Sequence, residues 1–411
     1  MIENQDIIVM GIQAWDIEIG SNCKNIALEF AKNNRVLYVN PPLDRVSKYR
    51  ERHTEKIKKR IRVLKGEDDD LVQIGGTLWN LYPKTLTESI NFLKGKAFDF
   101  FNKRNSKGFA NDILEAAESL GFKDYIVFND SSMFLGQYIK EYLNPSFYVY
   151  YMRDYLTKNP YWKKNGVRLE PKLIENADCV VNNSTLYAEY GKQYTEHSFM
   201  VGQGCDTSLF NDQIREIEIP TDLLSIPKPI IGYVGFLSSR RLSINILEHL
   251  AKARPDWSIV LVGPEDDLFS VSRLHEIDNV YFLGSRDSSQ LPNYIKGFDV
   301  AINPQHINEA TMGNYPRKID EYLAMGKPTV ASATKAMEYF KEHTYLGETP
   351  EDYVVLIEKA LKENSTNLEA SRREFGLSHS WENNVNEIYK CILRVKENQP
   401  KSKQQWALSL P

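Results

Sequence analysis

A lysine and a glutamate three residues apart could do chemistry in this chain. Lys318 and Glu321 follow Pro316 and precede Gly326, and proline in a first turn and glycine after a last turn are typical of helix ends. Side chains three apart share a helix face, and a helix N-terminus attracts phosphate. The lysine could bind a diphosphate, and the neighbouring carboxylate could bind the two hydroxyls of a ribose. Together they predict a nucleotide-sugar site. On these residues alone, a surface ion pair is the alternative.

Bulk composition bounds the class of protein. The chain has 411 residues, which suits two domains, and 42% hydrophobic residues, which supports packed cores. Its net charge of −4 argues against a dedicated nucleic-acid binder. The first residues lack a signal-peptide pattern, and no apolar run approaches the roughly 18 residues that span a bilayer. The four cysteines form no CxxC pair, so we expect a reduced, cytoplasmic protein.

Short apolar runs alternate with helical patterns through both halves, which predicts an α/β fold of two doubly wound, Rossmann-like domains. The proline-containing segment 211–229 is typical of a linker. The residues from about 399 are typical of a disordered tail. We expect the ligand in a cleft between the domains, at the carboxyl ends of the strands. The predicted strands are Ile7–Met10, Val36–Val39, Leu71–Ile74, Tyr125–Phe128, Phe147–Tyr151, Cys179–Val181, Ser198–Val201, Ile230–Val234, Trp257–Val262, Val280–Leu283, Asp299–Ile302 and Pro328–Ala331.

Several motifs follow one another in order over about 200 residues of the second half. They are Gly204-Cys-Asp-Thr-Ser-Leu-Phe210, Ile231-Gly-Tyr-Val-Gly235, Val280-Tyr-Phe-Leu-Gly284, the segment from Pro316 to Val330, and Ser380-Trp-Glu-Asn-Asn-Val385. Together they resemble the retaining group 1 glycosyltransferases, and most closely the enzymes that build teichuronic acid or capsular polysaccharides. The first half adds only a general Rossmann pattern.

The resemblance implies the GT-B fold. An N-terminal, acceptor-binding domain would cover residues 1–210, and a nucleotide-sugar-binding domain would cover 228–378. A closing helix over 381–396 would pack back on the first domain. The implied activity is transfer of a sugar, with retention, from a nucleotide-sugar donor, which we expect to be UDP-linked, to a surface-polysaccharide or lipid-linked glycan. A GT-B UDP-sugar 2-epimerase and a non-catalytic nucleotide- or glycan-binding relative are the alternatives.

The resemblance also implies roles at the donor diphosphate. Glu321 would accept hydrogen bonds from the ribose hydroxyls, and Lys318 would meet the phosphates. Arg240 or Arg241 would neutralise the leaving diphosphate, because a guanidinium matches phosphate oxygens; a solvated basic turn is the alternative. Gly235, at the end of the preceding strand, would let the backbone approach the donor.

The contacts to the donor sugar depart from the family pattern. Where relatives carry a carboxylate eight residues before the conserved glutamate, this chain has Gly313. We expect Thr311 or Asn314, or Asn308 or Glu309, or the backbone of 311–314, to bind the sugar instead. This departure also motivates the non-catalytic alternative.

Three further positions match the family more loosely. Arg286 occupies the place whose backbone reads the base edge. Gly11, with the loop after it through Gly20, would let the backbone approach donor and acceptor, or would simply form a turn. Asp154 would contact substrate or aid proton transfer, or cap a helix.

The sequence offers no protein metal site. Asp68-Asp-Asp70 contains the Asp-x-Asp pattern with which another glycosyltransferase fold holds manganese. Here the pattern precedes a predicted strand, so we expect a solvated loop. The seven histidines form no HxxH or HExxH pair. We therefore expect neither a cofactor nor a metal requirement.

The segment 45–65 is strongly basic. It holds ten Lys or Arg residues against two Glu, with apolar residues at helical spacing. A basic amphipathic helix of this kind suits an anionic membrane surface, so peripheral membrane contact is expected. An ordinary domain helix with a solvated face is the alternative.

Overall fold

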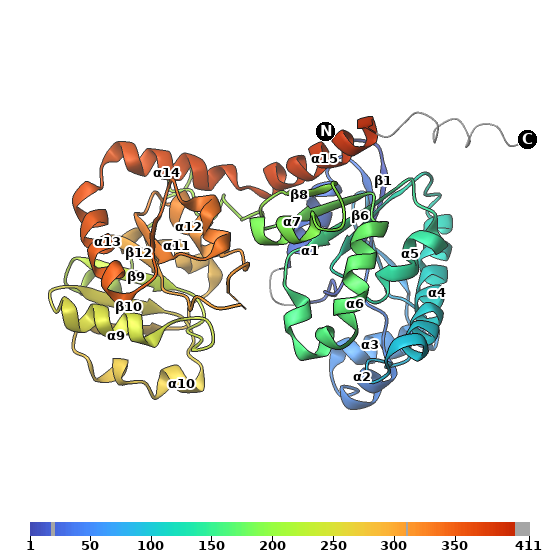
Figure 1. The fold of residues 1–411 in the computed structure, drawn as a ribbon, viewed down its shortest axis with the longest axis horizontal. Helices are drawn as coiled ribbons and strands as arrows, with labels where there is room; N and C mark the ends of the chain where they lie inside the picture. The colour runs from blue at the N-terminus through green and yellow to red at the C-terminus, as the bar shows by residue number, and fades with distance from the viewer. Residues whose placement is uncertain (18–20, 310, 399–411) are drawn as a thin grey trace, which may run out of the picture. The chain divides into compact units, whose positions relative to one another are not determined.

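The computed structural model describes residues 1–17, 21–309 and 311–398, in two compact units (Figure 1). Unit 1 comprises 1–183, 187–201 and the residues from Asn384 on; unit 2 comprises 184–186 and 202–383. Gly20 and the tail expected from residue 399 lie outside the described residues.

Unit 1 is built on an eight-stranded sheet with the order β3-β4-β2-β1-β5-β6-β7-β8. Neighbouring strands are parallel except for β3 and β4, which are antiparallel. The chain reverses direction across the sheet between β1 and β5, the switch point at which such sheets bind ligands. The strands are β1 (Asp6–Gly11), β2 (Arg35–Val39), β3 (Leu71–Gly75), β4 (Leu78–Leu81), β5 (Ile126–Asp130), β6 (Phe147–Met152), β7 (Cys179–Asn182) and β8 (Ser198–Met200).

Helices cover the unit 1 sheet (Figure 1). All residues of its central strands β1, β5 and β6 are buried. The helices are α1 (Asn22–Phe30), α2 (Arg45–Arg50), α3 (Glu55–Leu64), α4 (Gly95–Ser119), α5 (Gly136–Leu143), η1 (Leu156–Lys158), α6 (Pro160–Asn176), α7 (Thr185–Gly191) and α15 (Trp381–Asn398). From Asn384 on, α15 belongs to unit 1. The ring of Tyr389 stacks on Phe30, and its hydroxyl accepts a hydrogen bond from the Asn34 amide at 2.9 Å.

Unit 2 contains a six-stranded, fully parallel sheet with the order β11-β10-β9-β12-β13-β14. Its switch point lies between β9 and β12. Both sheets confirm the predicted doubly wound α/β class. The strands are β9 (Ile230–Val234), β10 (Ser258–Val262), β11 (Val280–Gly284), β12 (Val300–Asn303), β13 (Thr329–Ser332) and β14 (Tyr345–Gly347).

The unit 2 helices pack on both faces of this sheet in two hydrophobic clusters. They are α8 (Thr221–Leu224), α9 (Ile244–Ala253), α10 (Asp267–Ser270), η2 (Arg273–Glu276), η3 (Ser288–Gln290), α11 (Leu291–Gly297), α12 (Arg317–Ala324), η4 (Lys335–Phe340), α13 (Pro350–Glu363) and α14 (Thr366–Ser378).

The segment 211–229 is not the free linker that its prolines predict. It forms α8, and Ile217, Leu223 and Ile226 are buried in the core of unit 2. The division between the units falls instead at residues 201 and 202, so the expected first-domain boundary at 210 lies inside unit 2. Burial of three apolar side chains outweighs the turn-forming tendency of the prolines.

The basic segment 45–65 is also not one helix. A turn at residues 51–54 separates α2 from α3, because Thr54 caps α3 by accepting a hydrogen bond from the Ile57 N–H. Ile57 and Val63 are buried against unit 1. Arg60 is buried too, in a two-bond ion pair with Asp16 at 2.9 and 3.0 Å. Of the apolar residues expected to face a membrane, Ile57 therefore packs into the domain, whereas Val46 and Tyr49 are exposed.

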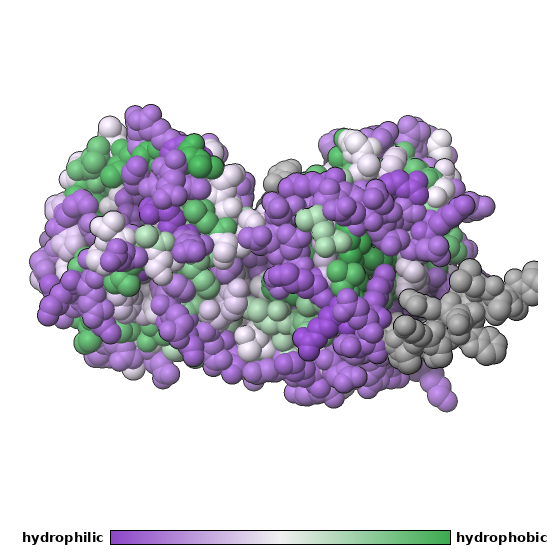
Figure 2. Space-filling view, turned by 90° about the horizontal axis from the view of Figure 1, so that it is seen from above, coloured by the Kyte–Doolittle hydropathy of each residue, from purple (hydrophilic) through white to green (hydrophobic). Residues whose placement is uncertain are grey.

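In the described ranges, no helix combines the length and apolar character needed to cross a membrane. Hydrophilic residues cover most of the face seen in Figure 2, and hydrophobic residues form separate groups among them.

Candidate functional site

Two glycines bring bare backbone together at the carboxyl ends of β9 and β10. Gly235 has φ +134° and Gly263 has φ +150°, conformations that favour glycine. A Cβ on Gly263 would lie 2.0 Å from the carbonyl oxygen of Gly235, so the two loops pack backbone against backbone. No side chain larger than hydrogen therefore fits at Gly263.

Lys318 lies in the space that Gly235 leaves open. Its amine donates a hydrogen bond to the Tyr233 hydroxyl at 2.6 Å and stands 4.4 Å from the centre of that ring. A Cβ on Gly235 would lie 3.0 Å from the same amine. Lys318 is therefore held at the end of β9, near the start of α12, and is not half of a surface ion pair with Glu321.

Glu321 is buried on α12, with 9% of its surface exposed. Its carboxylate lies 3.4 Å from the guanidinium of Arg317, one turn earlier. Burial raises the pKa of Glu321, and the charges of Arg317 and Lys318 oppose that rise without cancelling it. A buried carboxylate with one loose partner is suited to accept hydrogen bonds from ligand hydroxyls.

The loop after β9 carries Arg240 and Arg241, which are both exposed. Within the described ranges, neither guanidinium has an ion-pair or hydrogen-bond partner. The loop itself is fixed, because the carbonyl of Arg241 accepts from the His306 N–H at 2.8 Å and an imidazole nitrogen of His306 lies 3.1 Å from the Ser239 carbonyl oxygen. Both arginines therefore lie beside the loop after β12, and within the described ranges the N–H groups of their guanidinium groups have no partner.

Residues 311–314 form a compact turn in the loop after β12. The buried Thr311 hydroxyl donates to the His306 carbonyl, and the Asn314 N–H donates to the Thr311 carbonyl at 3.1 Å. The Thr311 hydroxyl is therefore used inside the loop. The half-buried Asn314 and the backbone around the buried Gly313 remain the candidates for contact with a sugar.

Arg286 uses its side chain within unit 2. Its guanidinium donates to the Tyr294 hydroxyl at 2.6 Å and to the Asp222 carboxylate at 3.0 Å. Only the backbone after β11, with Gly284 at φ +71°, is left to read a base, as the resemblance implies.

A buried network beside Glu321 was not found from the sequence. The carboxylate of Asp320 bonds the His379 imidazole at 2.6 Å and accepts from the Tyr315 hydroxyl at 3.1 Å. His379 also contacts the Tyr339 hydroxyl at 3.1 Å. Burial raises the pKa of Asp320 against these bonds. In the sequence, this network is indicated only by a charged residue, Asp320, at a helix position expected to be buried. That pattern does not identify the residues with which Asp320 bonds.

In unit 1, Gly11 lies against Asp130 at the switch point. The two residues are paired across β1 and β5, and a Cβ on Gly11 would lie 3.1 Å from that of Asp130. Arg153 joins the fully buried Asp130, at 2.8 Å, to the partly exposed Asp154, at 3.0 Å. Asp154 is thus an ion-pair partner and not a helix cap; Asn159 caps α6. Sequence reasoning missed Asp130 and Arg153.

Asp68 and Asp70 form ion pairs with different basic side chains. Asp68 pairs with Arg62 at 3.2 Å and Asp70 with Lys84 at 3.1 Å. Across residues 1–17, 21–309 and 311–398, no group of three or more His, Cys, Asp or Glu side chains is arranged to hold a metal ion.

Comparison with known sequences matches residues 228–363 to the family model "Glycosyl transferases group 1". The "Putative teichuronic acid biosynthesis glycosyltransferase TuaH" of Bacillus subtilis (strain 168) is 28% identical over 225 residues. That alignment covers 52% of this chain and 56% of the relative, so it spans little more than half of either protein.

Solved structures match nearly the whole chain. Sucrose-phosphate synthase from Thermosynechococcus elongatus has a TM-score of 0.64 at 16% identity, over 96% of this chain and 100% of that one. Anabaena HepE in complex with UDP has a TM-score of 0.64 at 14% identity, over 95% and 100%. At these identities the likeness shows the fold, which is GT-B.

Proposed function

We propose that this chain, whose residues 228–363 form a group 1 glycosyltransferase domain, transfers a sugar from a UDP-linked donor to a surface-polysaccharide or lipid-linked glycan acceptor. The observation that carries the proposal is Lys318, held over Tyr233 beside the bare backbone of Gly235. A fixed cation at a glycine-lined strand end is suited to a diphosphate. The relative named for teichuronic acid biosynthesis and the neighbour bound to UDP support the acceptor and donor classes.

Unit 2 would bind the donor. Glu321 would accept hydrogen bonds from the ribose hydroxyls, and the backbone at 284–286 would contact the base. Asn314 and the turn at Gly313 would hold the sugar. As the bond from the sugar to the diphosphate breaks, negative charge grows on the leaving phosphate. Lys318, Arg240 and Arg241 would stabilise it, which is the main chemical task of such a site.

Unit 1 would bind the acceptor, with Asp154 and the backbone at Gly11 near the reacting group. We propose that the configuration of the sugar is retained and that no metal is needed, because side-chain cations are available for the diphosphate. Contact with an anionic membrane through the exposed cations of α2 and α3 is part of the same proposal.

Incubation with a panel of nucleotide sugars tests the function. Nucleotide released only with a glycan acceptor, and unchanged by EDTA, is the expected result. An isomerised nucleotide sugar would identify an epimerase, and binding without turnover a non-catalytic relative. Loss of turnover on chelation with rescue by manganese would overturn the metal-independent mechanism.

A further inference from the structure

Unit 1 contains an open pocket of about 650 Å³, here called the unit 1 pocket. Its lining includes residues at the switch point, where Gly11 ends β1, Ile12 follows it and Ser132 lies after β5. Its other walls come from α2, from residues 87–92, from α4 and from the start of α6. A pocket at a switch point of this size can hold a ligand of the size of a small saccharide.

Aromatic rings form one wall of the unit 1 pocket. The rings of Phe134 and Trp162 lie 4.9 Å apart, and Tyr161 stands edge-on to Trp162 at 5.2 Å. Phe92, with 72% of its surface exposed, is part of the lining as well. The face of an aromatic ring carries negative charge, and the C–H groups on one face of a sugar ring carry weak positive charge. This wall therefore suits a saccharide ring.

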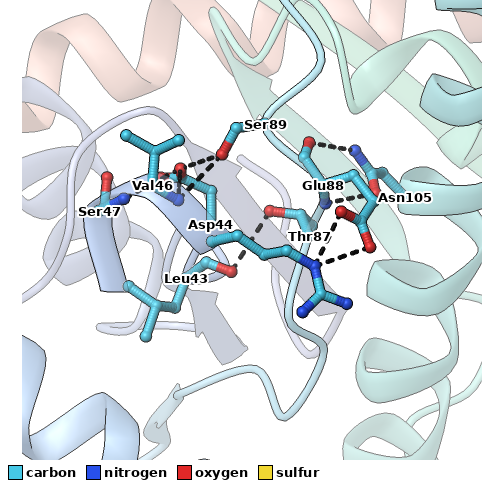
Figure 3. Close-up of polar contacts among 9 residues, drawn as sticks. Leu43, Asp44, Val46, Ser47, Thr87, Glu88, Ser89 and Asn105 are labelled. Carbon is cyan, nitrogen blue, oxygen red and sulfur yellow. Dashed lines mark hydrogen bonds and ion pairs between the residues drawn. The ribbon is translucent and has the colours of Figure 1, made fainter. Parts of the chain in front are cut away.

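A polar wall of the unit 1 pocket is held in place by hydrogen bonds (Figure 3). One carboxylate oxygen of Asp44 accepts from the Val46 and Ser47 N–H groups and from the Ser89 hydroxyl. The Asn105 amide bonds both the N–H and the carbonyl of Glu88, each at 2.9 Å. The start of α2, residues 87–89 and α4 are thus joined, and the wall is preorganised.

Asp44 can accept further hydrogen bonds from a ligand. The three hydrogen bonds described above all use Oδ1, and a carboxylate has about four lone-pair sites on its two oxygens. Burial raises the pKa of this carboxyl, but hydrogen bonds from Ser47 and Ser89 outweigh burial and leave the pKa below its usual value. Burial raises the pKa of Tyr161, and the negative charge of Asp44 raises it further. An ionised acceptor therefore lies near the aromatic wall, where it can bind sugar hydroxyls.

Arg50 lines the pocket, and its charge is unpaired among the described residues. Arg45, on the same helix, is paired: its Nε–H is shared between the two carboxylate oxygens of Glu88, at 2.9 and 2.8 Å. Arg50 is exposed and lines the pocket, and none of the described residues forms an ion pair with it. A free guanidinium is suited to phosphate, which it can bind with two hydrogen bonds.

We propose that the unit 1 pocket binds a saccharide that carries a phosphate. Its ring would lie on Trp162 and Phe134, its hydroxyls on Asp44 and its phosphate on Arg50. The proposal rests on the proposed function, because it names the chemical class of the acceptor. The phosphate could belong to a lipid-linked sugar or to a free sugar phosphate, and the test separates these sources.

Ligand-observed NMR on the full chain with UDP present tests the proposal. The probes are glucose, galactose and N-acetylglucosamine, each with and without a 1-phosphate. We expect at least one 1-phosphate to bind about 10-fold more tightly than its neutral sugar, since hydrogen bonds to charged groups contribute about that much at an exposed site. Arg50→Gln should remove the preference. Arg52→Gln, which changes the same charge on a side chain stacked on Tyr49 outside the pocket, should keep it.

A second pair of variants tests the aromatic wall. Trp162→Leu should weaken the phosphorylated and neutral sugars alike, whereas Phe100→Leu, at an exposed ring outside the pocket, should not. Tighter binding of a decyl glycosyl phosphate than of the free sugar phosphate identifies a lipid-linked source, and equal binding a soluble one. UDP binding without any sugar phosphate binding, or a preference that survives Arg50→Gln, overturns this proposal alone. Failure to bind UDP counts against the proposed function instead.

Discussion

The amine of Lys318 lies 2.6 Å from the hydroxyl of Tyr233 and above its ring. This contact joins the start of α12 to the end of β9, across a separation of 85 residues in sequence. It holds the cation beside the backbone of Gly235, while the carboxylate of Glu321 pairs with Arg317. The two residues that share a helix face thus have different partners, and different tests apply to them.

Lys318→Ala should weaken UDP binding by about 10-fold or more while leaving uridine nearly unchanged, because a charge-assisted bond to phosphate is lost. Tyr233→Phe keeps the ring under the amine and removes only one hydrogen bond, so we expect a loss of about 3-fold. Calorimetric titration of each variant with UDP and uridine measures both. Equal losses for the two ligands would place Lys318 away from the phosphates.

Glu321→Ala should weaken UDP and uridine alike, by about 10- to 150-fold, because the ribose is common to both and hydrogen bonds to a charged group contribute about 1.5–3 kcal/mol. Arg317→Lys is the matched control, since it changes the other member of the 3.4 Å ion pair on the same helix and keeps a positive charge beside Glu321. That variant should bind both ligands nearly as the parent does. A folded Glu321→Ala protein with parental affinity would leave the carboxylate without a role in binding.

Association with anionic vesicles should be salt-sensitive and should depend on the exposed cations of α2 and α3. Changing the half-buried Lys48 and the exposed Lys56 and Lys58 to Gln should lower co-sedimentation, since each cation near the surface contributes about 1 kcal/mol at low salt. Arg60 is unsuited to this test because it is buried against Asp16. Sedimentation that is absent, or equal for variant and parent, would show that this surface is only solvated.

Stability should fall as pH rises from about 4.5 to about 7 because of Glu170. Its carboxyl is buried and accepts from the Tyr150 hydroxyl at 3.1 Å. Burial raises its pKa from 4.5 to about 7. The folded state therefore holds the proton more tightly than the unfolded chain. The resulting stabilisation is complete below about pH 4.5 and is lost as pH rises to about 7, a change of roughly 3 kcal/mol.

Glu170→Gln removes this titration. Urea unfolding at pH 5 and pH 8 should show a smaller difference for the variant than for the parent. Asp112→Asn is a control at a second buried carboxyl, whose pKa is raised by burial while a hydrogen bond from the Thr85 N–H opposes the rise. This control should reduce the difference less than Glu170→Gln does. An unchanged difference in Glu170→Gln would mean that the carboxyl is ionised in the folded state.

Strand identity was predictable where burial on both faces leaves a continuous apolar run. β4 (Leu78–Leu81) was missed, because Trp79 and Asn80 interrupt its pattern and it follows β3 after a glycine turn. The division of 45–65 into two helices was missed because the cap at Thr54 is a local polar signal inside a strongly periodic stretch. In both cases a few neighbouring residues, and not the apolar periodicity of the segment, determined the secondary structure.

The sequence by itself determined the class of fold and the order of the donor-site segments, because apolar periodicity and glycine positions act locally. Only the tertiary structure decided which partner each charge has. Lys318 bonds Tyr233, Asp154 reaches the buried Asp130 through Arg153, and Arg50 stays free while Arg45 is paired. Charged side chains reach partners brought close by strand order, and the distance between such residues in sequence says nothing of their distance in space.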